Sequence, residues 1–401
     1  MIQTKKTNRN TIIAVVSIAM FLLLMLVVEN TITPASRWSM LLVVLRRSAV
    51  YALVAVSLNL LNGFTGLFSL GHAGFMLIGA YAYAAFSIPS DAKYAMVYQY
   101  FEPLIKFSFP EIFENLLGGP GMLFGVFISI TLAGLIAAAT GFLVGLPVLR
   151  LKGNYLSIAT LGFAEIIRTI FVWSRLGPIT NGSNPLRLFT RMNSFFIEIG
   201  DSRINYGLVL LMIVSALCIF IIILLVNSSY GRAFKAIRED EIAAEAMGIN
   251  LYKHKQISFT ISCFFTGIGG ALLAIFMGAA VADNFRVAMS YEVLLIVVLG
   301  GLGSISGSII GAFLFMFSSE WWLRGLDSGS FLGLSLPFFL PGFRLVVFSV
   351  ILLLVILFFR RGMMGDNELP YYIDKWRSKF GGKLKAFHSR KKGTSDPKAG
   401  V

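Results

Sequence analysis

The stretch GLVLLMIVSALCIFIIILLV, residues 207–226, contains twenty residues without a charged side chain. A helix needs about 20 apolar residues to cross the core of a bilayer, so this stretch predicts a transmembrane helix. Further apolar runs lie along the chain, at 11–28, 48–61, 72–88, 122–147, 155–173, 257–277 and 338–359. Together with a broken apolar region at 291–318, they predict an all-α polytopic membrane protein of about 8–10 transmembrane helices, with glycine-broken or re-entrant segments.

The composition agrees with a membrane protein and excludes several other classes. Hydrophobic residues make up 57% of the 401 residues and charged residues only 13%, against roughly a quarter in soluble domains. So little charge excludes an ordinary soluble enzyme, a disordered protein and a nucleic-acid-binding domain. Cys218 and Cys263 lie within apolar runs and lack metal-ligand spacing, so we expect small buried side chains rather than a metal site.

The balance of charge predicts an orientation. Lys and Arg outnumber Asp and Glu by 34 to 20, which leaves a net charge of +14. Cations gather before the first apolar run, in the 227–256 loop and in the tail 370–401. By the positive-inside rule these segments belong in the cytoplasm. The segments 89–120 and 174–206 are then expected outside.

The first apolar run follows three cations, as a signal peptide would. It has no small-x-small cleavage site before Glu29 and is long for a signal sequence, so it is interpreted as a retained helix. The expected organisation is a cytoplasmic N-terminus at 1–10, a membrane domain at 11–369 and a basic cytoplasmic tail at 370–401. The protein is therefore expected in the cytoplasmic (inner) membrane, with both termini in the cytoplasm.

The region 291–318 is apolar but is interrupted by Gly300, Gly301, Gly303 and Gly307. If 257–277 leaves the cytoplasm and 338–359 returns to it, this region must begin and end outside. The part before the glycines is too short to cross as a helix. Irregular backbone at membrane depth is tolerated where it is buried in protein or lines a cavity. The region is therefore predicted to be a re-entrant translocation element.

A weak internal repeat points to the same conclusion. The pattern G-x-x-G-x-x-S begins at Gly63 and again at Gly300, and both copies run on to a Gly-Ala. Broken helices expose backbone groups that can hold the carboxylate and ammonium of a zwitterion. The predicted substrate pathway comprises Thr65, Gly66, Ser69, Gly71, His72, Gly74, Gly303, Ser304 and Ser306. The alternative is that these small residues only let helices pack closely.

Three polar side chains within the apolar runs allow two interpretations each. Glu165 and Arg168 share a helix face and can pair, which lowers the cost of burying each. They form either a static clamp between helices or a polar link from the cytoplasmic face to the pathway. His72 follows the first glycine cluster and has no metal partner in the sequence. It either caps and packs a broken helix or contacts the substrate.

The 227–256 loop contains SSYGRAFKAIREDEIAAEAMGINLYKHKQ, residues 228–256. A short helix is predicted over 238–247, and Gly248 ends it as a C-cap would. Ala243, Ala244 and Met247 fall on one face of that helix. This small apolar face suits a groove on another protein; the alternative is a helix lying on the membrane surface.

The pattern R-E-D-E-x-A-A-x-x-x-G at 238–248 resembles the EAA coupling loop of ABC importer permeases. Three further segments, at 58–84, 145–170 and 291–312, resemble the branched-chain amino acid permeases of the LivH/LivM type, and the LivM half most closely. The resemblance implies that the residues that couple to an ATPase are Gly231, Arg232, Arg238, Glu239, Asp240, Glu241, Ala243, Ala244 and Gly248. Related urea permeases share most of these segments.

This resemblance implies an importer subunit that translocates branched-chain or other neutral amino acids and is not itself an enzyme. Its implied partners are a second, LivH-like permease subunit, two ATPase subunits, an extracytoplasmic substrate-binding protein and membrane lipid, with no nucleic acid. The chain contains no P-loop sequence, so ATP and magnesium would bind to the ATPases and no cofactor or metal to this chain. The departure from the family pattern is Thr180 to Pro185, where a T-G-G-x-x-G stretch is usual.

Two other functions remain open at this point. The first is a permease for urea or a short amide, because neutral substrates held by backbone groups leave no charge signature in the sequence. The second, from a different class, is an ion-coupled secondary transporter, which also uses broken helices at internal repeats. That second function would leave the helix at 238–247 without a role.

Overall fold

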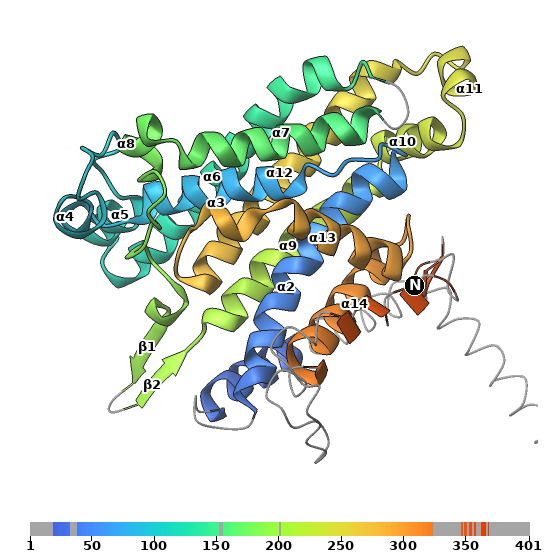
Figure 1. The fold of residues 1–401 in the computed structure, drawn as a ribbon. Coiled ribbons are helices and arrows are strands. Elements are labelled where there is room, and N and C mark those ends of the chain that lie inside the picture. The colour runs from blue at the N-terminus through green and yellow to red at the C-terminus, as the bar shows by residue number, and fades with distance from the viewer. Residues whose placement is uncertain are drawn as a thin grey trace, which may run out of the picture.

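The structure, a computed structural model, describes residues 19–32, 38–151, 155–199, 202–323 and short pieces between 346 and 368. The described chain is a bundle of helices with one small β-hairpin (Figure 1). The segments long and apolar enough to cross a membrane are Ser39–Phe64, Gly119–Val148, Tyr155–Val172, Gly207–Asn227 and Leu251–Met277. The predicted all-α polytopic fold is confirmed.

The elements follow one another in a simple order. After a helix at Ala19–Thr31 come α2 (Ser39–Asn59), η1 (Leu60–Phe64), α3 (His72–Ser87), α4 (Ser90–Ala92), η2 (Lys93–Val97), α5 (Phe109–Leu117), α6 (Gly119–Val148) and α7 (Tyr155–Val172). Next are η3 (Ser174–Leu176), α8 (Gly177–Thr180), η4 (Met192–Ser194), β1 (Phe196–Ile199), β2 (Ser202–Asn205), α9 (Gly207–Asn227), α10 (Ser229–Glu239) and α11 (Glu241–Ala246). The last are α12 (Leu251–Met277), η5 (Ala282–Phe285), α13 (Val287–Gly300), α14 (Ile305–Met316) and η6 (Phe317–Trp322).

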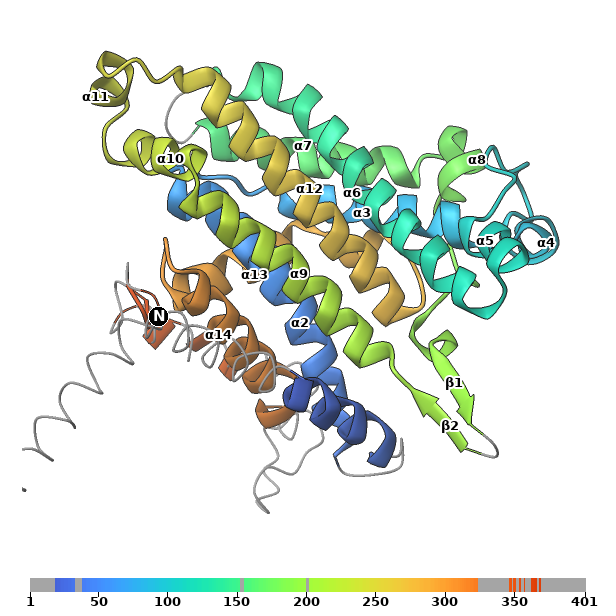
Figure 2. The ribbon, with the colours of Figure 1, turned by 180° about the vertical axis from the view of Figure 1, so that it is seen from behind.

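The bundle has two distinct ends. At one of them, called here the coupling end, lie α10 and α11 (Figure 1). At the far end lie α4, α5, α8 and the antiparallel hairpin of β1 and β2 (Figure 2). The segments predicted outside, 89–120 and 174–206, supply the far-end elements, while the predicted cytoplasmic loop supplies α10 and α11.

The helix α2 lies at the centre and packs against α9, α12, α13 and α14. The helix α12 also packs closely on α3 and α6. A Cβ at Gly79 of α3 would lie 2.0 Å from the carbonyl oxygen of Gly267 on α12, so the absence of a side chain lets these backbones touch. Part of the small-residue content therefore serves close packing, as the alternative interpretation held.

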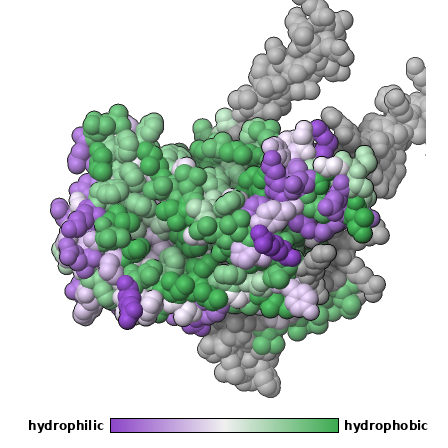
Figure 3. Space-filling view, turned by 90° about the horizontal axis from the view of Figure 1, so that it is seen from above, coloured by the Kyte–Doolittle hydropathy of each residue, from purple (hydrophilic) through white to green (hydrophobic). Residues whose placement is uncertain are grey.

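The outer surface matches a protein that crosses a membrane. Seen from above, apolar residues cover the middle of the molecule and polar residues gather toward both ends (Figure 3). Exposed apolar side chains on α6 and α9 include Phe124, Leu143 and Phe220. Lipid tails would cover such side chains without cost.

The second span begins earlier than predicted. The sequence placed it at 48–61, with Arg46 and Arg47 at its outer end, whereas α2 begins at Ser39. Both arginines therefore lie inside the helix, where Arg46 Nη2 pairs with Glu29 Oε1 at 2.8 Å and Arg47 pairs with Glu320. The paired carboxylates allow the apolar helix to contain two cations.

The predicted helix at 238–247 is wrong in its bounds. The chain forms α10, which ends at Glu239, and a separate helix α11. Asp240 has an extended φ of −158°, and its carboxylate accepts hydrogen bonds from the backbone N–H groups of Ile242 and Ala243. Because an aspartate caps a new helix better than it continues an old one, the acidic run breaks the helix.

The loop at 180–185, which departs from the family's glycine-rich pattern, still has two residues in the left-handed conformation. Asn181 and Gly182, which follow Thr180, have φ values of 60° and 64°. Asparagine is among the non-glycine residues that best tolerate this conformation, so it can stand where the family pattern has glycine. The predictions for 1–10 and 370–401, and most of the predicted span 338–359, lie outside the described residues.

Candidate functional site

The first glycine-rich segment interrupts the chain between α2 and α3. After η1, residues 65–71 run without helix until α3 begins at His72. Thr65 Oγ1 lies 2.6 Å from Ser258 Oγ on α12, and Gly66 has a φ of 75°, which favours glycine. These two predicted pathway residues turn the chain out of α2 and tie it to α12.

The end of this first break is fixed against α7. The backbone N–H of Leu70 donates to Thr160 Oγ1 at 3.1 Å. A Cβ at Gly71 would lie 2.8 Å from the carbonyl oxygen of Thr160, and one at Gly74 would lie 2.8 Å from Cα of Ala164. Both glycines therefore let the start of α3 lie directly against α7.

His72 and Ser69 are buried at this junction, with 2% and 1% of their surfaces exposed. His72 Nε2 lies 3.1 Å from Ser262 Oγ, whose hydroxyl donates to the carbonyl of Ser57 at 2.7 Å. The backbone N–H of Ser69 donates to Asn62 Oδ1 at 3.1 Å. These contacts agree with a packing role for His72, and substrate contact stays a prediction. Among the described residues, no cluster of His, Cys, Asp and Glu could hold a metal.

The second glycine-rich segment lies where the sequence predicted a broken span. The chain reverses between α13 and α14 at residues 301–304, called here the hairpin tip. Gly301 and Gly303 have φ values of 117° and 91°. A Cβ at Gly300 would lie 2.4 Å from the backbone of Gly307, so the two helices touch. Ser304 Oγ accepts from the Gly307 N–H at 3.1 Å and caps α14.

One residue of α2 holds the hairpin tip. Asn59 is fully buried, and its Nδ2 donates to the carbonyl of Ser304 and to Ser308 Oγ, both at 2.8 Å. Its Oδ1 accepts from the N–H of Gly303 at 2.8 Å. A Cβ at Gly63 would lie 2.5 Å from that same nitrogen. The role of Asn59 could not be predicted from the sequence, because its partners lie more than 240 residues further along the chain.

A second contact holds the hairpin tip from the C-terminal side, through residues 362–365 and Glu368, called here the C-terminal strap. The N–H groups of Met363 and Met364 donate to the carbonyls of the last two residues of α13, at 2.9 and 3.1 Å. The Glu368 carboxylate accepts from the N–H groups of the first two residues of α14, at 2.8 and 3.0 Å, and from the Ser306 hydroxyl. The strap thus pairs the free backbone carbonyls at the end of α13 and the free N–H groups at the start of α14.

The coupling end reaches the hairpin tip through Arg238 of α10. Its Nη1 donates to the carbonyl of Gly63 at 2.8 Å, and its Cγ would lie 3.1 Å from a Cβ at Gly66. Its Nη2 also pairs with Glu239 Oε1 at 2.9 Å. Because Gly63 touches the hairpin tip, Arg238 contacts the segment at which the two breaks meet.

The helix α11 exposes an apolar end. The side chains of Ile242 and Met247 are 82% and 83% exposed, whereas Ala244 is buried. The predicted face of Ala243, Ala244 and Met247 is therefore divided, and Ile242 takes the place of Ala244 on the exposed side. Such a pair of apolar side chains on a six-residue helix is suited to insertion into a partner.

The other predicted coupling residues shape this loop. Gly231 lies against the end of α9, where a Cβ would be 2.0 Å from a carbonyl oxygen. Arg232 bonds within α10, and Glu241 Oε2 pairs with Lys255 Nζ of α12 at 2.7 Å. Gly248 has a φ of 84°, the left-handed conformation expected after a helix end.

The pair of Glu165 and Arg168 forms as predicted. Arg168 Nε donates to Glu165 Oε1 at 2.9 Å, and Nη1 of the same arginine lies 3.3 Å from Asp283 Oδ1 on η5. The pair therefore clamps α7 to the loop that follows α12, in agreement with the static interpretation. The polar link to the cytoplasmic face stays a prediction.

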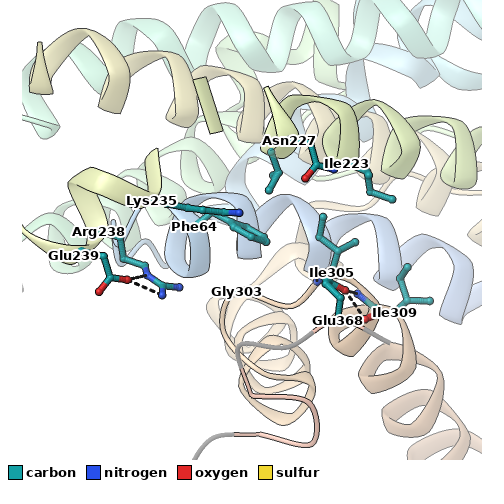
Figure 4. Close-up of a pocket in the computed structure, with 12 residues that line it drawn as sticks. Phe64, Ile223, Asn227, Lys235, Arg238, Glu239, Gly303, Ile305, Ile309 and Glu368 are labelled. Carbon is teal, nitrogen blue, oxygen red and sulfur yellow. Dashed lines mark hydrogen bonds and ion pairs between the residues drawn. The ribbon is translucent and has the colours of Figure 1, made fainter. Parts of the chain in front are cut away.

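A cavity of about 560 Å³, called here the coupling cavity, lies at the coupling end (Figure 4). One wall comes from α9 and α10, the other from the hairpin tip, α14 and Glu368, and Phe64 lies between them. Gly303 and Ser306 of the predicted pathway and Arg238 of the predicted coupling set line it. The structure thus brings together residues that the sequence had assigned to two separate roles.

A comparison with known proteins decides the family. The family model described as "Branched-chain amino acid transport system / permease component" matches residues 40–359. The chain belongs to this permease family. That range takes in α2 to η6, with both breaks and the coupling loop.

Individual relatives agree. The high-affinity branched-chain amino acid transport system permease protein LivM of Salmonella typhimurium is 32% identical over 292 residues, which is 68% of this chain and 61% of that protein. The LivM protein of Escherichia coli matches to the same extent. A probable branched-chain amino acid transport permease protein LivM of Methanocaldococcus jannaschii is 25% identical over 80% of this chain and 92% of its own length.

The other type of permease in the family is more distant. The LivH protein of Salmonella typhimurium is 23% identical over 80% of this chain and 93% of its own length. No solved structure matches the chain. The chain spans about three fifths of the two bacterial LivM relatives, or 61% of each.

Proposed function

We propose that this chain is the membrane-spanning subunit of an ABC importer in the cytoplasmic membrane, and that it carries branched-chain or other neutral amino acids inward. Two separate ATPase subunits supply the energy, with ATP and magnesium bound to them. A LivH-like permease pairs with this chain, and an extracytoplasmic binding protein delivers the substrate to the far end. The relatives' names and the match to the permease family support this proposal.

The observation that carries the proposal is the hydrogen bond from Arg238 to the carbonyl of Gly63. It joins α10, the helix just before α11 with its exposed apolar side chains, to the terminus of the central span. Gly63 in turn touches the hairpin tip, which Asn59 holds. A push on α11 by an ATPase would therefore reach both helix breaks through rigid contacts. An ion-coupled transporter has no need of this connection.

The substrate class follows from what lines the breaks. The polar groups there are backbone amides, hydroxyls, Asn59, His72 and the Glu368 carboxylate, which already caps α14. The start of α3 is therefore the helix end whose dipole favours a substrate carboxylate, and free carbonyls favour an ammonium. A neutral zwitterion therefore fits better than a charged solute.

The pairing with a second permease is supported by α7. It is the least buried of the five candidate spans, at 22%. Beside exposed apolar side chains such as Ile158 and Ile166, it carries the partly exposed carboxylate of Glu165. A carboxylate on a lipid-facing surface is costly. This face therefore suits a partner subunit or a water-filled path between two subunits.

The test of coupling is Gly248→Leu in the complex assembled with its ATPases. Gly248 has a φ of 84° and no atom within 4 Å of an added Cβ, so leucine strains the end of α11 without a clash inside the bundle. We expect the subunit to insert normally, while ATPase association and substrate-stimulated ATP hydrolysis fall about tenfold. Co-purification measures ATPase association. ATP hydrolysis is measured in the same proteoliposomes as substrate uptake.

The matched control is Gly278→Leu at the far end. Gly278 follows α12 in the left-handed conformation, with a φ of 68°, and an added Cβ would meet only the Arg191 side chain, at 3.5 Å. It therefore carries a similar strain without touching the coupling loop. Normal ATPase association with Gly248→Leu, or an equal loss with Gly278→Leu, contradicts the coupling assignment. Uptake of urea but not leucine by the wild-type complex contradicts the substrate class.

A further inference from the structure

The two walls of the coupling cavity carry opposite charges. Lys235, Arg238 and Glu239 lie on the α10 wall, which keeps one net positive charge because Glu239 pairs with Arg238, and Glu368 lies on the α14 wall (Figure 4). Both walls are built on elements that the proposed function requires to move relative to each other. Opposite charges placed across a gap attract more strongly as the gap narrows and water leaves it.

The two cations of the α10 wall differ in what they bind. Arg238 is committed to the Gly63 carbonyl and to Glu239. Lys235 Nζ lies 5.6 Å from the centre of the Phe64 ring, and no described residue gives it a hydrogen bond or an ion pair. In Figure 4 its side chain points into the cavity above Phe64. A lysine on its flexible stem can therefore turn to a new partner.

The anion on the other wall is held in place. Glu368 sits on the N-terminus of α14, a twelve-residue helix, through three hydrogen bonds. A carboxylate offers about four acceptor positions, so Glu368 can accept a hydrogen bond from an ammonium without leaving the helix end. The C-terminal strap thus presents a fixed negative charge to the α10 wall.

We propose that Lys235 and Glu368 form a charge gate. When ATP-driven movement of α11 carries α10 toward α14, the lysine pairs with the glutamate and the ion pair closes the coupling cavity. When the ATPases separate, the pair breaks and the cavity opens again. This proposal rests on the proposed function, because it requires that the coupling loop moves.

A pair of cysteines measures the width of the cavity without touching the gate. Asn227→Cys on α9 and Ile309→Cys on α14 place one thiol on each wall, and the chain's own Cys218 and Cys263 are buried. The complex is reconstituted in nanodiscs with its ATPases and second permease. The yield of cross-linking by a short bifunctional maleimide is compared without nucleotide and after trapping with ATP and vanadate.

Changes of charge at Lys235 then test the gate. In the wild-type background we expect trapping to raise the cross-linking yield about fivefold, and Lys235→Glu or Lys235→Gln to remove most of that rise. Lys235→Arg, which keeps the cation, should retain the rise to within about twofold. The changes are made at Lys235 because Glu368 also caps α14, and its replacement would release the hairpin tip. Lys253→Glu, at the base of α12 and outside the cavity, should change nothing.

The outcomes separate the gate from the proposed function. A rise on trapping that persists in Lys235→Glu and Lys235→Gln, or a Lys235→Arg variant as impaired as these two, overturns the gate and leaves the coupling assignment standing. A wild-type cavity whose width does not respond to trapping overturns the coupling assignment, and the gate with it.

Discussion

Between η1 and α3 the chain runs through residues 65–71 without helix and is fixed by side chains of α7 and α12, whereas between α13 and α14 it reverses within residues 301–304. The second break is held by one asparagine on α2 and by one glutamate of the C-terminal strap. The two breaks share the pattern G-x-x-G-x-x-S. Their surroundings, rather than their sequence, set what each can do.

The difference indicates a division of labour. The first break lies inside the bundle, where moving it would strip bonds from several helices at once, so it acts as a fixed interruption. The second break faces the coupling cavity and is held by Asn59 and the C-terminal strap rather than by several transmembrane helices, so we expect it to move when α10 moves. Transport would then use the first break as the fixed part and the second as the moving part.

The largest effect is expected from Asn59→Leu, which removes the contact of α2 with the hairpin tip. It leaves the buried N–H of Gly303 without its acceptor, which costs about 3 kcal/mol. We expect a lower midpoint of thermal unfolding and loss of uptake. The control is Ser215→Ala, because that buried hydroxyl on α9 has no hydrogen-bond partner in the described structure and its loss should be almost neutral. Equal stability of the two variants would mean that Asn59 does not hold the hairpin tip.

The first break is tested by Thr160→Val, which keeps the shape of the side chain and removes the acceptor for the Leu70 N–H. A cost of about 1–2 kcal/mol is expected, with uptake falling in proportion to stability because this break is fixed. Thr169→Val makes the same change on the same helix, where the hydroxyl only bonds its own backbone. Unfolding in denaturant and uptake are measured for both variants. A loss of uptake by Thr160→Val at full stability would show that the first break moves too.

The sequence predicted the spans well because the bilayer imposes length and apolarity on each of them. The apolar run at 207–226 became α9 almost without change, and the glycines at 300–303 marked the break between α13 and α14. Both features depend on residues that are neighbours in the sequence, so both can be recognised from the sequence alone.

What the sequence could not predict depends on distant contacts. Asn59 stands in an apolar run and reveals its role only when residues more than 240 positions away fold against it. Glu368 lies after the last apolar run, and nothing nearby indicates that it caps α14. The break between α10 and α11 depends on a local feature, the N-cap residue Asp240. It was not predicted, because the residues on either side of Asp240 favour a continuous helix.

A smaller effect is expected from Gly66→Ala, at the point where the first break meets the coupling loop. The φ of 75° strains alanine by about 1 kcal/mol, and the new Cβ would lie 3.1 Å from Arg238 Cγ. Gly278→Ala, at a φ of 68° in the left-handed conformation, carries a similar strain and makes only an ordinary contact with the Arg191 side chain. We expect equal loss of stability from the two variants and a fall in uptake only from Gly66→Ala. Equal uptake by the two variants would mean that the contact of Arg238 with the first break is not needed for transport.

The smallest effect is expected from the two serines that end the repeated pattern. Ser306→Ala removes one of three hydrogen bonds to Glu368 and costs about 0.5–1 kcal/mol. Hydrogen exchange in the first turn of α14 should therefore quicken. Ser69 Oγ only accepts a long bond of 3.4 Å from the Gly71 N–H, so Ser69→Ala should leave the first turn of α3 unchanged. If both variants instead lose uptake equally with normal exchange, both serines contact the substrate. The two breaks would then form one pathway, and their contrast would lie only in how they are held.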